Sequence, residues 1–262
     1  MKNSLLVIIP HYNNLKGLNR TLNSIREKVL LDVLIVDDGS THPAINKKIM
    51  YKGNYKIILL KKNSGIGVAL NEGLEYAMSN DYEFIGRLDC GDLCHKNKFT
   101  KQLNYLIKNK DIMLLGTWVR IIDQQGNFKY NLKHPTDYNS IKKNMYYNSM
   151  FVHPTVVFRT KIVEVIGKYP YKYRRAAQDY SFFFKIINQF KAENFPEILL
   201  DYEQSKSSIS TLNRRAQVYN RIRIIIDNFY FGITPIYAIV RSLILMITPL
   251  KVISLLKIKF YK

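Results

Sequence analysis

The sequence predicts an α/β fold built on a mostly parallel, doubly wound sheet, followed by a helical appendage at the C-terminus. Over residues 5–115, short apolar runs alternate with segments in which apolar residues recur at helical spacing. Three of the runs end in polar, glycine-containing turns, which is how parallel sheets form a crevice for a nucleotide. Hydrophobic residues make up 47% of the 262 residues, enough for one large folded domain.

The predicted strands are continuous apolar runs, as expected for strands that are covered on both faces. They occupy residues 5–9, 32–36, 56–60, 82–88 and 112–115. A first helix is predicted after Asn14, a residue type that caps helices, a second opens at residues 63–67 and a third spans residues 98–108. Beyond Trp118 the alternation becomes irregular, with a hairpin turn at residues 124–127, an apolar strand within 151–159 and a helix near Gln178.

The charge balance indicates an acidic partner. The chain has 40 Lys and Arg against 20 Asp and Glu, a formal charge of +20. Nucleic acid, anionic lipid and phosphorylated substrates are the partner classes that fit. The two cysteines, Cys90 and Cys94, lack the spacing of a zinc site and are expected to be reduced thiols in the cytosol. The apolar run at residues 5–9 is too short for a signal-peptide core.

Two carboxylates follow the fourth predicted strand in the stretch Arg87-Leu88-Asp89-Cys90-Gly91-Asp92. Carboxylates at this end of a sheet suit a hard divalent cation that also binds a phosphate. A strand followed by an Asp-Gly turn and a helix cap explains the same residues. Taken alone, the stretch fits both interpretations equally.

A second acidic turn, Asp37-Asp38-Gly39-Ser40, follows the second predicted strand. A carboxylate there can accept the imino proton of a pyrimidine or hold a ribose hydroxyl, although an ordinary turn is the commoner explanation for such a motif alone. The turn at Asn63 and Gly65 can face phosphates at a helix N-terminus, but it lacks the spacing of a dinucleotide or P-loop motif.

Two residues of the second half are candidates for work on an acceptor. His153 precedes Pro154 where an apolar strand is expected to begin, which fits either a structural turn or a position beside the acceptor. Asp179 lies where a helix is predicted to begin. The helix dipole favours a carboxylate there in any protein, and a general base is the functional alternative.

Taken together, these motifs resemble family 2 glycosyltransferases of the GT-A fold over roughly residues 4–120. The resemblance implies the inverting transfer of a sugar from a nucleoside diphosphate sugar to a hydroxyl. It also implies a nucleotide-sugar site formed by Pro10, Tyr12, Asn13, Asp37, Asp38, Asn63, Gly65, Asn71, Arg87, Leu88 and Asp89. By the same resemblance, Asp89 and Asp92 bind Mg²⁺ or Mn²⁺, Asp179 is the catalytic base and His153 lies on the acceptor side.

The chain departs from the family pattern at two places. The family commonly has Asp-x-Asp, whereas the third position here is Gly91, so Asp92 must reach the cation from one residue later or metal binding is weaker. The Gln-x-x-Arg-Trp motif of processive members is absent from the sequence, which predicts transfer of one sugar per acceptor.

The predicted glycosyltransferase domain covers residues 1–220, with a nucleotide-sugar half at about 1–120 and an acceptor half at about 121–220. Residues 221–262 form a basic, amphipathic helical tail. Its longest uncharged stretch, residues 228–240, is shorter than the roughly 20 residues that span a bilayer. We expect helices that lie on an anionic membrane surface, in a cytoplasmic protein bound to the inner face of the cell membrane. A helical cap packed on the domain is the alternative.

The expected partners are a nucleoside diphosphate sugar, a lipid-linked or glycan acceptor and the membrane surface. Nucleic acid is not expected, because the crowded carboxylates would repel its phosphates unless a cation were present. Gly91 keeps open a non-catalytic basic binding module on a degenerate transferase fold. A nucleotidyltransferase is a weaker alternative, since Pro10 and His11 stand where its glycine-rich, basic loop would follow the first strand.

Overall fold

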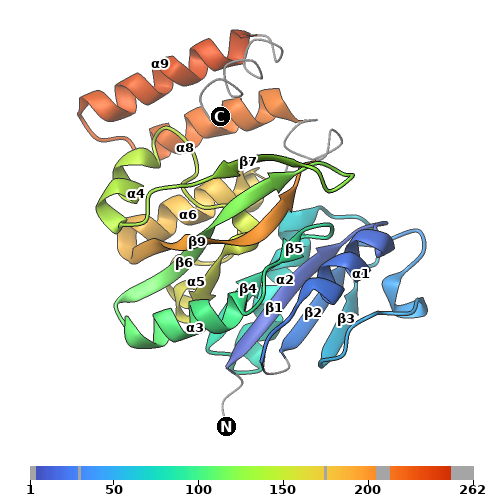
Figure 1. Ribbon diagram of the computed structural model, residues 1–262. Coiled ribbons are helices and arrows are strands. Elements are labelled where there is room, and N and C mark those ends of the chain that lie inside the picture. The colour runs from blue at the N-terminus through green and yellow to red at the C-terminus, as the bar shows by residue number, and fades with distance from the viewer. Residues whose placement is uncertain (1–3, 29–30, 174–175, 205–212, 249–262) are drawn as a thin grey trace.

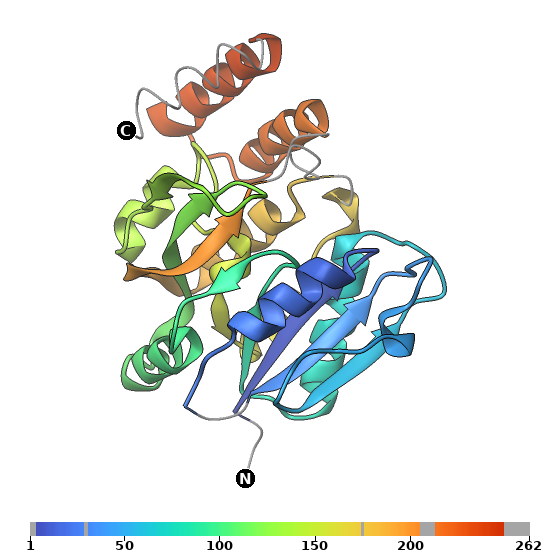
Figure 2. The same ribbon diagram turned by 45° about the vertical axis from the view of Figure 1, so that its right-hand side comes forward.

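The computed structural model describes residues 4–28, 31–173, 176–204 and 213–248. One curled sheet runs through these residues in the strand order β3-β2-β1-β4-β8-β6-β9-β5, and β7 pairs with β6 (Figure 1). Helices cover both faces of the sheet, and two C-terminal helices form a further layer at one end (Figures 1 and 2). The predicted α/β class is confirmed.

The first half of the sheet is parallel, as predicted. Its strands are β1 (Leu5–His11), β2 (Asp32–Asp37), β3 (Tyr55–Leu59) and β4 (Phe84–Arg87). Alternate residues of β1 pack on opposite faces: Leu6 and Ile8 on the side of α2 (Ile66–Ser79), and Val7 and Ile9 on the side of α1 (Leu15–Ser24). Asn14 caps α1 by accepting the Gly17 N–H at 2.9 Å, which confirms the predicted start of that helix.

The second half of the sheet is mixed. Strand β8 (Val157–Arg159) runs antiparallel to both β4 and β6 (Ile112–Ile122), whereas β9 (Lys191–Glu203) runs parallel to β6 and antiparallel to the short β5 (Leu93–Cys94). The strand predicted at residues 112–115 therefore continues to Ile122, and the one expected within 151–159 begins only at Val157. The predicted hairpin turn joins β6 to β7 (Phe128–Leu132).

The other elements lie along both halves of the sheet. Helix α3 (Lys98–Lys108) matches its predicted bounds, and α6 (Gln178–Gln189) begins where predicted. Before the C-terminal layer, the structure also contains the helices α4 (Tyr138–Asn144) and α5 (Lys161–Ile166). The described residues also form three single 3₁₀ turns, η1 (Ala44–Asn46), η2 (His153–Thr155) and η3 (Tyr171–Tyr173).

The C-terminal layer consists of α8 (Arg214–Asp227) and α9 (Ile233–Ile247). Helix α8 runs across position 221, where the tail was expected to begin. It packs on the main core through Ile224 and Ile225. Pro249 and the tail lysines at 251, 257, 259 and 262 lie outside the described residues. Among the helices in the described part of the chain, none is long and apolar enough to cross a membrane.

Candidate active site

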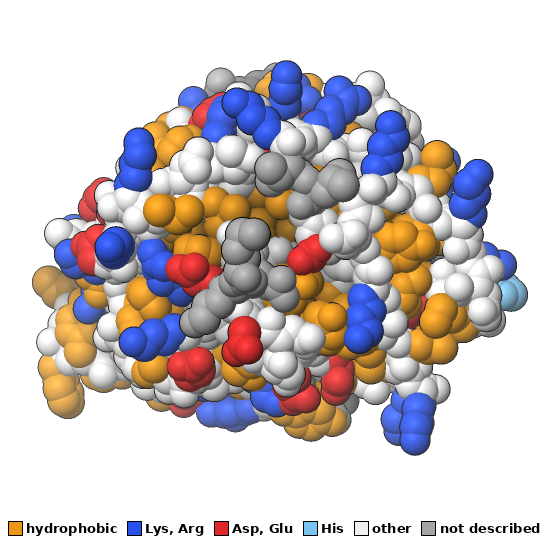
Figure 3. Space-filling view, turned by 90° about the horizontal axis from the view of Figure 1, so that it is seen from below, with side chains coloured by type: hydrophobic (Ala, Val, Ile, Leu, Met, Phe, Trp, Pro, Cys, Tyr) orange, Lys and Arg blue, Asp and Glu red, His pale blue; other side chains and the backbone are white. Residues whose placement is uncertain are grey.

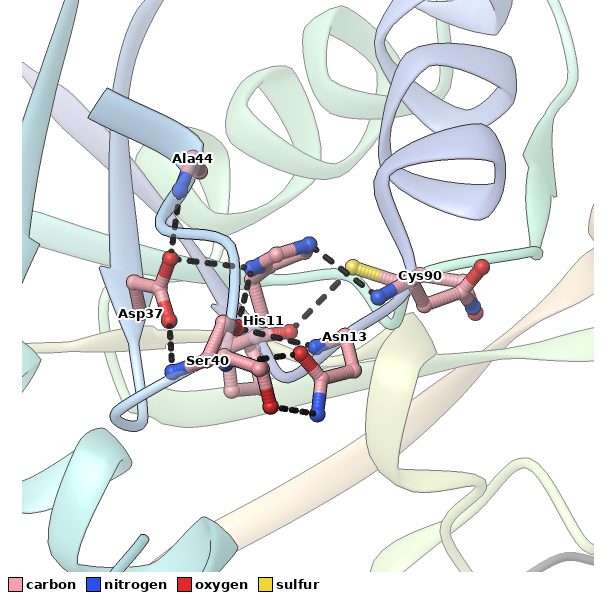
Figure 4. Close-up of polar contacts among 9 residues, drawn as sticks. His11, Asn13, Asp37, Ser40, Ala44 and Cys90 are labelled. Carbon is pink, nitrogen blue, oxygen red and sulfur yellow. Dashed lines mark hydrogen bonds and ion pairs between the residues drawn. The ribbon is translucent and has the colours of Figure 1, made fainter. Parts of the chain in front are cut away.

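The loop after β2 is fixed by the carboxylate of Asp37, which has no exposed surface. Its Oδ1 accepts the Ser40 N–H at 2.9 Å and its Oδ2 accepts the Ala44 N–H at 2.7 Å (Figure 4). Burial alone raises the pKa of this carboxyl, but the hydrogen bonds from Ala44 and Ser40 outweigh burial and hold the pKa below its usual range. Asp37 therefore shapes the loop, and contact with a base stays a prediction for its neighbour Asp38.

His11 joins the first two strand ends and was not among the predicted site residues. Its Nδ1 lies 3.3 Å from Asp37 Oδ2, and its Nε2 accepts the Asn14 N–H at 3.2 Å (Figure 4). Burial lowers the pKa of His11 even though Asp37 acts in the opposite direction, so the imidazole is neutral with its proton on Nδ1. The sequence places both residues at or just after the ends of apolar runs, but only the strand register shows that His11 and Asp37 face each other.

Asn13 ties the loop after β1 to the loop after β2. Its backbone adopts a positive φ of 48°, its N–H donates to Ser40 Oγ at 2.9 Å and its Oδ1 accepts the Thr41 N–H at 2.9 Å. The neighbouring Tyr12 is 48% exposed, so its ring is available for stacking. Pro10 is half-buried beneath this turn, and its carbonyl accepts the Cys90 thiol at 3.3 Å.

An open hollow of about 510 Å³ adjoins these loops. It is lined by His11, Asn13, Leu15, Thr41, His42 and Lys47. The hollow thus offers amide and hydroxyl hydrogen-bonding groups together with a lysine. Its position beside Asn13 and Tyr12 is the place at which the sequence predicted a nucleotide.

Asp38 holds the start of α2 from the end of β2. Its Oδ1 accepts the Ser64 N–H and its Oδ2 accepts the Gly65 N–H, both at 2.8 Å. Burial raises the pKa of Asp38 despite these bonds. Each carboxylate oxygen has a second lone pair, so a further donor can still be accepted. Asn63, two residues before Gly65, is exposed on the same loop.

Arg87 is among the largest fully buried side chains of the protein and organises the end of β4. Its guanidinium donates to the Leu88 carbonyl at 3.0 Å and to Asp89 Oδ1 at 2.8 Å. Leu88 itself has no exposed surface and serves through its backbone. The Asp89 side chain, at 31% exposed, is thereby held in one direction by a cation that water cannot screen.

The other side of Arg87 lies against His153, whose Nε2 is 3.4 Å from the arginine Nε. Tyr169 places its hydroxyl 2.8 Å from the same imidazole nitrogen. Burial, followed by the charge of Arg87, lowers the pKa of His153 well below its usual value, so the ring is neutral. Asn71 fixes this group by accepting the Tyr169 N–H at 2.9 Å and donating to its carbonyl at 3.0 Å.

Asp179 lies in the first turn of α6, partly exposed. The preceding Gln178 packs so closely on α2 that a Cβ at Gly67 would stand 1.9 Å from its Oε1. The Asp179 turn is therefore pressed against the same helix start that Asp38 holds. Burial raises the pKa of Asp179, and the negative charge of Asp89 adds to the effect. The structure thus brings Asp179 into the field of Asp89 from a position 90 residues later in the chain.

The sequence profile of "Glycosyl transferase family 2" matches residues 6–167. The chain belongs to glycosyl transferase family 2. A relative from Escherichia coli, named UDP-Gal:alpha-D-GlcNAc-diphosphoundecaprenol beta-1,3-galactosyltransferase, is 30% identical over 82% of this chain and 77% of its own. In Staphylococcus aureus TarS 1–349, solved with UDP-GlcNAc, 92% of this chain and 71% of that chain superpose at 20% identity and a TM-score of 0.68. Mannosyltransferase PcManGT from Pyrobaculum calidifontis, solved with GDP-Man and Mn²⁺, has a TM-score of 0.63 at 16% identity over 91% of this chain and 68% of its own.

This glycosyltransferase has a further aspartate at the candidate site, Asp92, which is turned away from solvent. Its Oδ1 accepts the Glu203 N–H at 2.9 Å. Its Oδ2 is buried and has no hydrogen-bond partner in the described part of the chain. Burial and the nearby charges of Asp89 and Glu203 raise the pKa of Asp92 well above its usual value. A proton or a cation would relieve this carboxylate.

The residues present fit a divalent cation that is shared with a substrate. Among the described residues, no three His, Cys, Asp or Glu side chains already form a metal site. Mg²⁺ commonly binds to one or two carboxylates and completes its shell with phosphate and water. The partly exposed Asp89 and the unsatisfied Oδ2 of Asp92 supply the two carboxylates of such a site.

Tyr202 on β9 lies near the candidate site and was not predicted from the sequence. Burial raises its pKa, and the charges of Asp92, Asp89 and Asp179 add to the rise in that order. Tyr202 therefore lies within electrostatic reach of three of the aspartates that the sequence singled out, Asp89, Asp92 and Asp179. No local signal marks it, since its neighbours are brought together only by the pairing of β9 with β5 and β6.

Proposed function

We propose that this glycosyltransferase moves one sugar from a nucleoside diphosphate sugar to a hydroxyl of a lipid-linked acceptor, with inversion, in the synthesis of a bacterial surface polysaccharide or glycolipid. The observation that supports this most directly is the placement of Asp179. A carboxylate at the start of α6, with a raised pKa, lies in the electrostatic field of Asp89 and Arg87 at the end of β4. The proposed base therefore lies within electrostatic reach of the carboxylate that is proposed to serve the diphosphate.

In the proposed reaction, the acceptor hydroxyl attacks the anomeric carbon from the side opposite the diphosphate. The new C–O bond forms as the bond to the diphosphate breaks, and the leaving oxygen keeps the electron pair. Asp179 takes the hydroxyl proton. Arg87 holds Asp89 in place throughout, because it is buried and bonded to Asp89 Oδ1 at 2.8 Å. A divalent cation, when bound by Asp89 and Asp92, stabilises the charge on the departing diphosphate.

Two arginines lie on the side of Asp179 at which the acceptor is proposed to bind, which suits an acceptor that carries its own diphosphate. Helix α8 brings Arg221 close enough for its charge to act on Asp179, and Arg241 of α9 acts on Arg221 in turn. Both arginines are anchored, Arg221 to Asn148 Oδ1 and Arg241 to the Tyr147 carbonyl, each at 2.9 Å. The E. coli relative is named for an undecaprenol-diphosphate-linked acceptor, which supports the same acceptor class here.

The first test is the unfolding midpoint of the purified protein with UDP, GDP, CDP or dTDP, with and without Mn²⁺. A ligand that binds only the folded state raises this midpoint by mass action. We expect a rise with one diphosphate that increases when Mn²⁺ is added. A diphosphate that binds while no hydroxyl acceptor is glycosylated would support the non-catalytic module instead. No response to any nucleotide would contradict the proposal.

The same proposal places α9 on a membrane surface at the inner face of the cell membrane. One side of this helix packs on the protein through Ala238 and Ser242. The solvent side is an apolar stripe at helical spacing: Ile233, Ile236, Tyr237, Val240, Leu243, Ile244 and Ile247, all exposed. Phe231, in the turn before the helix, is 99% exposed. An apolar surface of this kind marks an interaction site on a folded protein.

The placement of α9 also suits a lipid-linked acceptor. The carboxyl ends of β1 and β2 point toward the upper side of the molecule in Figure 1, the side on which α8 and α9 lie. On the opposite end, Lys and Arg side chains are interspersed with Asp and Glu (Figure 3). The apolar stripe would therefore bring the acceptor side, rather than that mixed surface, to the lipid.

Sedimentation with vesicles tests this placement. We expect the protein to pellet with vesicles that contain phosphatidylglycerol and less with neutral ones. Ile236→Glu with Ile244→Glu should abolish pelleting, whereas Ile107→Glu, at an equally exposed position on α3, should leave it unchanged. Equal pelleting by both variants would remove the membrane role of α9.

A further inference from the structure

The place at which the acidic motif lacks a carboxylate is covered by another carboxylate. Gly91 adopts a φ of +113°, and an ideal Cβ built on it would lie 3.3 Å from Glu203 Oε1 and 3.6 Å from Oε2. The side chain of Glu203, the last residue of β9, thus occupies the space that a residue at position 91 would enter. Because a side chain at this φ is strained and would also crowd Glu203, the glycine is what allows Glu203 to lie there.

Glu203 is held in this position by two contacts, one from the acidic turn and one from α1. Its N–H donates to Asp92 Oδ1 at 2.9 Å, which fixes the backbone against the acidic turn. Its Oε2 accepts from Arg20 of α1 at 2.7 Å. With Oε2 engaged, Oε1 is the carboxylate atom nearest the Gly91 position. The side chain is 17% exposed, so the arginine contact is only partly screened by water.

The turn beneath Glu203 is tied to the same helix. Thr21, the residue after Arg20, accepts the Gly91 N–H at 2.9 Å through its hydroxyl and donates to the Asp89 carbonyl at 3.1 Å. Helix α1 therefore supports both the acidic turn, through Thr21, and the Glu203 side chain, through Arg20. We expect a substitution in the acidic turn to alter the position of Glu203, and a substitution at Glu203 to alter the turn.

A second, independent observation points to a ligand at this place. Asp92, which is 3% exposed, leaves Oδ2 buried without a hydrogen-bond partner among the described residues. Asp89 has Arg87 and Glu203 has Arg20 as its cationic partner. Two guanidinium groups thus face three carboxylates, and in the described part of the chain Asp92 forms no ion pair of its own. Such a group is stable when a cation completes it.

We propose that Glu203 supplies the carboxylate that the acidic motif lacks at Gly91, and that Glu203 and Asp89 together bind the divalent cation that holds the donor's diphosphate, while the buried Asp92 holds the Glu203 backbone and adds negative charge behind them in place of a direct metal contact. The proposal rests on the proposed transferase function. Two carboxylates and the diphosphate oxygens are the ligand set that Mg²⁺ or Mn²⁺ commonly takes. Arg20 is the positioning residue that directs Glu203. The departure at Gly91 is then a relocation of a metal ligand from the turn to β9.

The test measures Mn²⁺ binding without relying on turnover. For the full chain, the unfolding midpoint is followed against MnCl₂ concentration at fixed UDP, and bound Mn²⁺ is measured without nucleotide by electron paramagnetic resonance. Glu203→Gln keeps the shape and can still accept from Arg20, but it removes the charge. Glu203→Asp keeps the charge but shortens the side chain by one methylene, which moves the carboxylate away from the Gly91 position. Glu197→Gln, the same change at an exposed position of β9, is the control.

We expect the Mn²⁺ concentration for half-maximal response to rise at least about tenfold in both Glu203 variants, since losing even an outer-shell partner costs 10- to 100-fold. The control should stay within about twofold of the parent, because tenfold is the smallest effect expected at the site. UDP binding without metal should be unchanged. Parent-like Mn²⁺ binding in the Glu203 variants, with UDP binding that still needs Mn²⁺, would overturn this inference and leave the proposed function standing. No response of the parent to any nucleoside diphosphate would remove the function, and the nucleotide-free Mn²⁺ titration would still decide the role of Glu203.

Discussion

Replacing Asp37 by Asn tests how the nucleotide side of the site is built. Asp37 Oδ1 accepts the Ser40 N–H and Oδ2 accepts the Ala44 N–H, at 2.9 and 2.7 Å. Asparagine has one acceptor oxygen, so one of these backbone donors would face an NH₂ group. Leaving a buried N–H unpaired costs about 1–3 kcal/mol, and the cost is at the upper end when the lost acceptor was charged.

A loss of about 3 kcal/mol in the free energy of unfolding is therefore expected at pH 7. In a protein of this size that lowers the midpoint by about 6–12 °C, at 2–4 °C per kcal/mol. Asp123→Asn is the matched control, because Asp123 Oδ1 also accepts two backbone N–H groups at 2.9 Å, but on a surface hairpin. Thermal and urea unfolding should show little change for the control.

The pH dependence gives the sign of the effect. The folded-state pKa of Asp37 is below its usual range, so the ionised form is the one that stabilises the fold. That stability is present above the unfolded pKa of about 3.9 and is lost as the pH falls through the lower folded value. The difference in the free energy of unfolding between the parent and Asp37→Asn should accordingly become smaller below about pH 4. A loss under about 0.5 kcal/mol at pH 7, the size of an ordinary surface change, would refute the reasoning.

Three further variants probe other contacts. Asp92→Asn removes a buried carboxylate whose Oδ2 lacks a donor. The unfolding midpoint without metal should therefore rise, by about 2–4 °C for each kcal/mol of stability gained, and the Mn²⁺-induced rise should disappear. A lower metal-free midpoint would contradict this. Asn71→Leu deletes both hydrogen bonds to the Tyr169 backbone and should cost about 1–3 kcal/mol in urea unfolding, with parent-like stability counting against the anchor. Gly39 has a φ of +69°, and Gly39→Ala would place a Cβ 2.4 Å from the Lys62 carbonyl carbon. UDP binding measured by calorimetry should therefore be lost. Retained binding would show that the loop can move.

The first half of the fold could be predicted because its signals are local. Strands β1 and β2 are continuous apolar runs, and α1 and α3 show helical periodicity with clear ends. The parallel sheet then follows from alternation and from the handedness of crossovers. The position of Asp179 at a helix start was also local, since Gln178 and Asp179 precede a strongly apolar segment.

The second half could not be read in the same way, because its strands pair over long sequence distances. Strand β8 lies antiparallel between β4 and β6, and Glu203 meets Asp92 across 111 residues. No periodicity in either segment records such a contact. For the same reason Glu203 and Tyr202 were not predicted as site residues, although each lies beside the aspartates that were.

The distinction between neighbouring aspartates also required coordinates. Asp37 is the last residue of β2 and turns inward to Ala44, whereas Asp38 turns toward Ser64 and Gly65. The sequence shows two identical side chains in a row, and one residue of register decides which way each faces. His11 was missed similarly, because its partner Asp37 lies on the next strand.

The central claim is that Asp179 is the base of a sugar transfer, and turnover of Asp179→Asn beside the parent tests it most directly. A general base contributes roughly 10²- to 10⁴-fold, so the variant should lose at least about 100-fold in turnover while its UDP-induced rise in midpoint stays parental. In the parent, activity should fall as the pH drops through a pKa that burial has raised above the usual Asp value, and the variant should lack this limb. Near-parental turnover of Asp179→Asn with an unchanged acid limb would contradict the account.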